Sequence, residues 1–187
     1  GLQAAGWLLW LAGAHLNMAV GLLGLAAAWI GLTWSVVLFW RLVLGSDVAD
    51  RVHAKTVGLG GVVGVLCLAG VGLALAAGQP ALALVLVRTA LWGFIVVTFV
   101  AVAHRMIPFF TSSVLPMIEI WRPFWVLWLM LGIAAFEVLA LWVDWALPPP
   151  RWWTLLVMAV EIAVGAVLIW LAVVWGLAQS LKIRLLA

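Results

Sequence analysis

The chain has 187 residues, of which 69% are hydrophobic and 8% are charged, and its mean hydropathy is +1.34. In a water-soluble domain about a quarter of the residues are charged, so this composition excludes a water-soluble domain. It predicts an integral membrane protein whose main partner is the lipid bilayer. Nine Lys and Arg against six Asp and Glu give a formal net charge of +3, and such sparse cations indicate no surface for nucleic acid.

The first apolar run extends from residue 2 to residue 44. At about 1.5 Å per residue it is roughly twice the length that crosses a bilayer core. Because His15 and Asn17 interrupt the run, we expect a shortened first span and then a full span at 18–44. One long tilted helix is the alternative. His15, beside Asn17 and Met18, is the weakest of the three histidines as a ligand candidate.

A polar stretch at 45–55 predicts a water-facing connection that includes His53. The next expected span, 56–77, is rich in glycine, with Gly60 and Gly64 at GxxxG spacing. Such glycines permit a close approach of either a neighbouring helix or a flat cofactor, and helix packing is the simpler interpretation. The single cysteine, Cys67, excludes an internal disulfide and is expected to be a structural apolar residue.

Gly78-Gln79-Pro80 predicts a tight turn before a span at 81–106. This span carries His104, Arg105 and Met106 at its end, because Pro108 is expected to stop the helix there. A loop at 107–122, a span at 123–145, a break at Pro148–Pro150 and a last span from 152 to about 179 complete the chain. The sequence thus predicts an all-α polytopic transmembrane helical bundle with about five full spans and a shortened first one.

We expect residues 1–187 to form a single transmembrane domain and, since apolar sequence reaches both ends, to be part of a longer membrane protein. Loop charges predict its orientation. If the spans alternate, Arg151 stands alone on one side, and the other side collects Arg41, Arg51, Lys55, Arg105, Arg122, Lys182 and Arg184. The side with the excess of cations is expected to be cytoplasmic, and it includes His53 and His104.

Three ionisable residues, Arg88, Glu137 and Glu161, fall inside predicted spans. Ionisable groups in a membrane are costly and therefore count as functional candidates. Counted along their helices, all three lie roughly 10–15 Å below the non-cytoplasmic surface, so they could meet in one buried cluster. Such a cluster would be either a polar or proton path, or an arginine satisfied by carboxylates that locks helices together.

His53 and His104 flank two successive spans, and antiparallel helices would bring them to a similar depth. Paired imidazoles can bind the two faces of a b-type haem, or a copper ion. Arg51 and Arg105 would suit propionates or another anion, and Met106 could be a soft ligand for Cu(I). The simpler interpretation is a hydrogen-bonded interfacial histidine and a methionine that fills the core.

The segment His104-Arg105-Met106-Ile107-Pro108-Phe109-Phe110-Thr111 resembles the central motif of the NnrS family. Further similar segments follow in the same order along the chain: Asp50-Arg51-Val52-His53-Ala54, Trp121-Arg122-Pro123 and Trp175-Gly176-Leu177-Ala178-Gln179-Ser180-Leu181. Members of that family are longer and carry further histidine segments that are absent here, so the chain resembles a middle portion.

The resemblance implies a haem- and copper-containing protein of the bacterial inner (cytoplasmic) membrane that acts in nitric oxide metabolism, nitrosative stress or denitrification. Its matched positions nominate His104 and His53 as ligands and Arg105 as a partner for an anionic group. Two other hypotheses stay open: a cofactor-free transporter-like bundle, and a structural membrane subunit, both built on Arg88, Glu137 and Glu161. The sequence leaves open whether the protein is an enzyme, but it holds no Walker loop, GxGxxG, HExxH, GxSxG or CxxCH motif.

Overall fold

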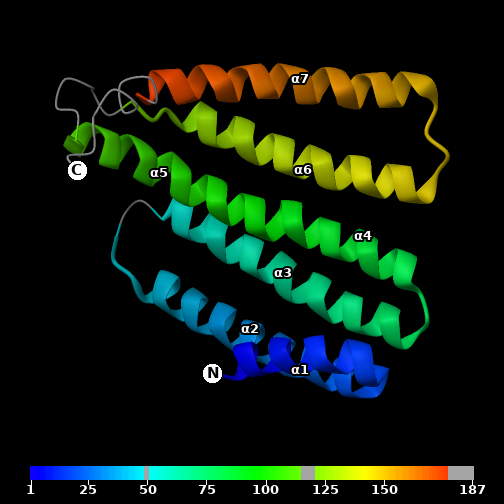
Figure 1. Cartoon of the computed structure of the whole chain (residues 1–187). Helices are drawn as coiled ribbons and strands as arrows, with labels where there is room; N and C mark the ends of the chain where they lie inside the picture. The colour runs from blue at the N-terminus through cyan, green and yellow to red at the C-terminus, as the bar shows by residue number, and fades with distance from the viewer. Residues whose placement is uncertain (49–50, 115–120, 177–187) are drawn as a thin grey trace, which may run out of the picture. The chain divides into compact units, whose positions relative to one another are not determined.

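The computed structural model describes residues 1–48, 51–114 and 121–176, and within these ranges every regular element is a helix (Figure 1). In chain order these are α1 (Leu2–Leu16), α2 (Met18–Gly45), α3 (Val52–Ala76), α4 (Pro80–Ala90), the π-helical turn η1 (Leu91–Val96), α5 (Val97–Val114), α6 (Phe124–Ala146) and α7 (Arg151–Val174).

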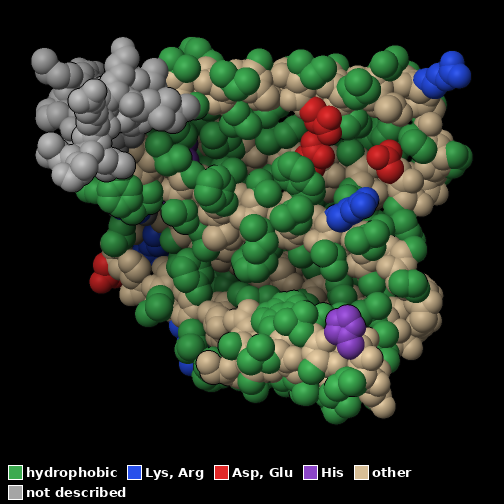
Figure 2. Space-filling view, in the orientation of Figure 1, with side chains coloured by type: hydrophobic (Ala, Val, Ile, Leu, Met, Phe, Trp, Pro, Cys, Tyr) green, Lys and Arg blue, Asp and Glu red, His purple; other side chains and the backbone are tan. Residues whose placement is uncertain are grey.

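Five helical segments in the described ranges are long and apolar enough to cross a membrane: Met18–Gly45, Val52–Ala76, Pro80–Phe110, Phe124–Ala146 and Arg151–Val174. Hydrophobic side chains cover much of the face shown in Figure 2, whereas charged side chains stand singly or in small groups on it. The predicted all-α architecture, with five full spans and a shortened first helix, is confirmed. The chain is a multi-pass membrane protein.

The chain divides into two compact units, which we call unit 1 (residues 1–99) and unit 2 (residues 100–187). The division falls near the start of α5, so the first residues of that helix belong to unit 1 and the remainder to unit 2. The single domain expected from the sequence stays a prediction, and each unit is described by itself.

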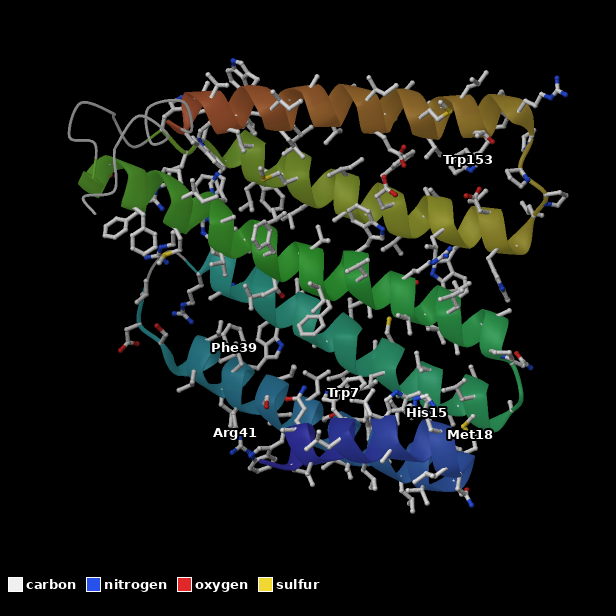
Figure 3. The ribbon with its side chains drawn as sticks, in the orientation of Figure 1. Trp7, His15, Met18, Phe39, Arg41 and Trp153 are labelled. Carbon is white, nitrogen blue, oxygen red and sulfur yellow. The ribbon has the colours of Figure 1, made fainter. Side chains whose placement is uncertain are left out.

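Asn17 separates α1 from α2 in unit 1. Its backbone is extended, with φ −161° and ψ 122°, and its side chain caps α2 by accepting a hydrogen bond of 2.8 Å from the Ala19 amide. The chain reverses there, and His15 and Met18 lie together at the turn (Figure 3). A Cβ atom built on Gly24 would lie 2.8 Å from the Gly6 carbonyl oxygen, so the two helices approach through their backbones. The predicted division of the first apolar run is confirmed.

Glycines also line both sides of α3. A Cβ atom on Gly58 would lie 2.8 Å from Trp40 of α2, and one on Gly64 would lie 2.5 Å from Phe94 of η1. Neighbouring helices therefore occupy these glycine surfaces, as the helix-packing interpretation expects. The buried core beside them consists of Leu25, Val71, Ala74 and Ala83.

Helix α3 begins at Val52, earlier than the expected residue 56, so His53 and Lys55 lie in its first turn. At its other end the predicted turn is present, with Gly78 at φ +69° and Pro80 opening α4. Glycine permits this left-handed conformation without a Cβ clash, and proline suits a first helical position because its missing N–H has no helical partner there.

Helix α5 corrects the boundary expected at Pro108. The helix continues to Val114, and Pro108 lies inside it as a buried residue. The prediction that Pro108 ends the helix near Met106, with a loop from 107, is therefore wrong. Transmembrane helices tolerate an internal proline because neighbouring groups and local adjustments satisfy the backbone that it leaves unbonded.

Unit 2 contains α6 and α7 besides the rest of α5. Pro123 precedes α6 and Pro150 precedes α7. Helix α7 ends at Val174, before the expected residue 179, which lies outside the described residues. The buried core of unit 2 consists of Val126, Met130, Leu171 and Trp175. Near the connection between α6 and α7, the Trp153 indole donates a 2.9 Å hydrogen bond to Asp144.

Candidate functional site around His104

Among the described residues of unit 2, His104 is the most enclosed ionisable one, with 1% of its surface exposed. Its ring nitrogen Nε2 lies 3.1 Å from the backbone oxygen of Pro123, which immediately precedes α6. A carbonyl oxygen can only accept a hydrogen bond, so Nε2 carries the proton and donates. In the neutral imidazole the lone pair is then on Nδ1, and the hydrogen bond fixes both the tautomer and the orientation of the ring.

Aromatic rings enclose the imidazole on its other sides. The centroid of the Phe124 ring lies 6.3 Å from that of His104, and the Trp175 ring meets it edge-on at 6.5 Å. Trp175 is held in turn, because its indole nitrogen donates a 3.1 Å hydrogen bond to the Trp121 carbonyl. His104 therefore joins three parts of unit 2: α5, the entry to α6 and the end of α7.

These contacts bring together three of the segments on which the family resemblance rests. His104 belongs to the central motif, Trp121 and Pro123 to the second segment, and Trp175 to the third. The sequence suggested no role for Trp175 or Phe124 as neighbours of His104. The similar segments occur in the same order as in the family, and this was the signal that they share a site. The spacing of these segments along the chain does not indicate which of their side chains meet.

Pro108 adds a backbone feature to the site. It follows His104 by one helical turn, and proline has no N–H to donate to the carbonyl oxygen four residues before it. The regular helical donor to the His104 carbonyl is thereby removed, although α5 continues through this position. At His104 the imidazole thus bonds to a backbone oxygen outside α5, and the backbone carbonyl lacks its regular helical donor.

Arg105 and Met106 directly follow His104 and are exposed, Met106 to 37%. Successive residues of an α-helix are about 100° apart, so Met106 projects roughly 200° from His104, on nearly the opposite side of α5. A single metal ion could not readily bind both side chains from one helix in this geometry. Arg105 remains accessible to an anionic group at the surface of unit 2.

His53 lies in the first turn of α3 and has 8% of its surface exposed. It belongs to unit 1, whereas His104 belongs to unit 2. The expected pairing of the two imidazoles therefore stays a prediction. His15, the third histidine, is exposed at the end of α1.

The expected cluster of ionisable residues is also divided between the units. Arg88 is an exposed residue of α4 in unit 1. In unit 2, Glu137 on α6 is half-buried, Glu161 on α7 is exposed, and the Glu161 carboxylate acts electrostatically on Glu137. The two carboxylates are therefore within electrostatic reach of each other. Their association with Arg88 stays a prediction.

The donors in unit 2 provide only part of a haem or metal site. Among the described residues, no group of three or more His, Cys, Asp or Glu side chains is arranged to hold a metal ion. His104 is the only histidine in the sequence of unit 2, so a second imidazole would have to come from outside that unit. Unit 2 therefore provides one oriented imidazole for a haem or a metal ion, but it does not provide a whole ligand set.

Comparison with known families gives a match that covers nearly the whole chain. Residues 2–187 match the family model described as NnrS protein. No curated protein and no solved structure matches the chain.

Proposed function

The chain belongs to the NnrS family, and we propose that it is a haem-binding membrane protein, with copper as a second candidate metal, that acts in nitric oxide handling or nitrosative-stress protection. The family match over residues 2–187 supports the general assignment. The cofactor and the role in nitric oxide chemistry are what membership implies. A bacterial cytoplasmic membrane is the location proposed with them.

The observation that carries the proposal is the convergence of family-like segments on His104. The His104 imidazole donates to the Pro123 carbonyl and packs against Trp175. Metal-binding histidines commonly donate their other ring N–H to a backbone carbonyl, which orients the ring and makes it a better ligand. The Pro123 hydrogen bond would give His104 this property.

Where two histidines hold the haem, His53 is the residue that we propose beside His104. Arg105, exposed one residue after His104, would suit a haem propionate because guanidinium groups pair well with carboxylates. Haem iron held by His104 alone would supply a centre at which a diatomic gas such as nitric oxide binds, whereas iron held by both histidines would supply electron transfer. Met106 is retained only as a candidate for a separate copper ligand, since it projects from a different side of α5.

The test is a reduced-minus-oxidised absorbance spectrum of the detergent-purified protein, combined with metal analysis. We expect Soret and α-band signals in the wild type, their loss in His104→Ala and their reduction in His53→Ala. His15→Ala, at an exposed position, is the matched control and should keep the signal. A wild-type protein with neither haem nor copper, from cells that supply both, would refute the proposal.

A further variant separates ligation from packing. The amide of His104→Gln can still donate a hydrogen bond towards Pro123, but it is a poor ligand for iron. If His104 binds haem, His104→Gln should lose the spectrum while keeping a wild-type melting temperature better than His104→Ala does. Normal haem content in His104→Gln would exclude His104 as a ligand.

The neighbouring Glu137 and Glu161 support a second candidate, a cofactor-free bundle in which these carboxylates and Arg88 line a polar path or lock helices together. Carboxylates on adjacent membrane helices are costly unless they share a proton or meet a cation. Glu137→Gln distinguishes the two forms of this candidate. A transport path should lose flux in liposomes with the fold intact, whereas a structural lock should lose thermal stability.

A further inference from the structure

An open groove lies between α2 and α3 in unit 1, away from the residues around His104. Its volume is about 360 Å³, which falls within the range of roughly 300–1,000 Å³ typical of ligand pockets. The side chains that matter for its chemistry are Val37, Trp40 and Arg41 of α2, and Val62 and Leu66 of α3.

The walls of this groove are hydrocarbon. The Trp40 indole donates its N–H to the Gly58 carbonyl at 3.2 Å, so its polar atom is satisfied within unit 1. The ring therefore presents carbon to the groove. Val62 and Leu66 are exposed to 38% and 66% although they belong to a membrane-spanning helix. Exposed apolar surface on a membrane-spanning helix contacts acyl chains, so the groove suits a lipid tail.

Cations stand at one end of the groove. Arg41 precedes the end of α2 at Gly45, and Lys55 follows the start of α3 at Val52. The two helix ends are joined directly, so both exposed cations flank the same end (Figure 3 labels Arg41). Lys55 also shares a helical face with Val62 and Leu66, at positions i, i+7 and i+11.

Arg51 adds to the positive charge at this end. Its Nη1 atom lies 3.4 Å from the Leu44 carbonyl oxygen, and Leu44 is itself part of the groove. The stem of Arg41 lines the groove, and a long side chain of this kind lets the guanidinium reach headgroup level while its methylenes stay in apolar surroundings. The sequence places Asp47 and Asp50 in the same connection, and the three cations exceed them.

We propose that this groove binds one phospholipid with an anionic headgroup, of the phosphatidylglycerol type. One acyl chain lies along Trp40, Val62 and Leu66, and the headgroup phosphate pairs with Arg41 and Lys55. A cation near the membrane surface contributes about 1 kcal/mol to the binding of an acidic lipid, which is about a five-fold change in affinity.

Native mass spectrometry of the purified whole chain tests this proposal. The protein is titrated with phosphatidylglycerol and, separately, with phosphatidylcholine of the same acyl composition. The wild type should retain the anionic lipid with higher affinity, and Arg41→Gln and Lys55→Gln should each reduce that preference by about five-fold. Arg41→Lys should keep most of it. Arg151→Gln, at an exposed cation at the start of α7, is the matched charge control and should leave it unchanged.

A second arm tests the groove itself rather than the charge. Val62→Trp fills the groove without altering any cation, and it should lower the retention of both lipids while the melting temperature confirms the fold. Equal retention of the two lipids by the wild type would overturn the proposal. An equal loss in Arg151→Gln, or full retention in Val62→Trp, would overturn it as well, because binding would then depend on general surface charge.

Discussion

Units 1 and 2 are both built from apolar helices, but their helices are held together by different kinds of contact. In unit 1, glycines bring backbones together: a Cβ atom on Gly24 would lie 2.8 Å from the Gly6 carbonyl oxygen. In unit 2, Gly132 and Gly165 meet no heavy atom within 4 Å among the described residues. The contacts there are made by large rings such as those of His104, Phe124 and Trp175.

The difference indicates where each unit is vulnerable. Lipid tails are as apolar as leucine, so membrane helices associate through close van der Waals packing and hydrogen bonds. Unit 1 depends mainly on close van der Waals packing, at glycine positions where no side chain fits. Unit 2 relies more on hydrogen bonds, in which ring N–H groups donate to backbone oxygens at helix ends. Substitutions that add volume and substitutions that remove a donor should therefore affect the two units differently.

The largest effect is expected from adding volume in unit 1. Gly24→Leu would force α1 away from α2, because even the first side-chain carbon would lie closer to backbone atoms than van der Waals contact allows. We expect a loss of about 3 kcal/mol or more in the free energy of unfolding, measured by thermal denaturation in detergent. Gly132→Leu, with open space around its Cβ position, should be nearly neutral. Similar losses in both variants would contradict the proposed difference between the units.

Removing the central donor of unit 2 comes next. His104→Ala deletes the hydrogen bond to Pro123 and leaves space beside Phe124 and Trp175. The loss of a buried bond and of packing should cost about 2–3 kcal/mol in the free energy of unfolding, whether or not a cofactor is bound. The comparison with His104→Gln, in protein freed of haem and metal, isolates the hydrogen bond. An unchanged melting temperature in His104→Ala would show that the enclosure of this ring contributes little to stability.

A smaller change isolates a single hydrogen bond. Trp175→Phe keeps an aromatic ring against His104 but removes the indole N–H that donates to the Trp121 carbonyl at 3.1 Å. We expect a loss of about 1 kcal/mol in the free energy of unfolding, the usual net contribution of one such bond. Trp128→Phe, at an exposed position of α6, controls for the general effect of a smaller ring. Equal melting temperatures in Trp175→Phe and Trp128→Phe would show that the hydrogen bond does not contribute to stability.

The smallest effect has the opposite sign. Gly132→Ala replaces a helical glycine that has open space around it. Alanine restricts the unfolded chain more than glycine does, so we expect a gain of about 0.5 kcal/mol, measured as a small rise in melting temperature. The same change at Gly64 would place a methyl group against the Phe94 ring and should be destabilising. A loss of stability in Gly132→Ala would indicate that a neighbour packs against α6 at this glycine.

The sequence predicted the spans because hydropathy and segment length are local properties, and Asn17 was recognisable as a polar break in an apolar run. The helix end predicted at Pro108 is wrong because proline stops helices in water-soluble proteins, whereas a membrane helix tolerates an internal proline more readily. His104 was found as a candidate from its position and from the family motif. Its partners were not, since Pro123 and Trp175 are distant in the chain and only tertiary packing brings them to the imidazole.

The π-helical turn η1 has a consequence for the rotational phase of the long helical segment from Pro80 to Val114. Its wider turn accommodates more residues than an α-helical turn, so the side chains after it are out of phase with those before it by up to about 100°. A helical wheel drawn continuously through this segment would assign the wrong directions to residues beyond Val96. Deleting one residue of η1 would reset the phase and turn residues 97–99 relative to α4, with each of their side chains unchanged.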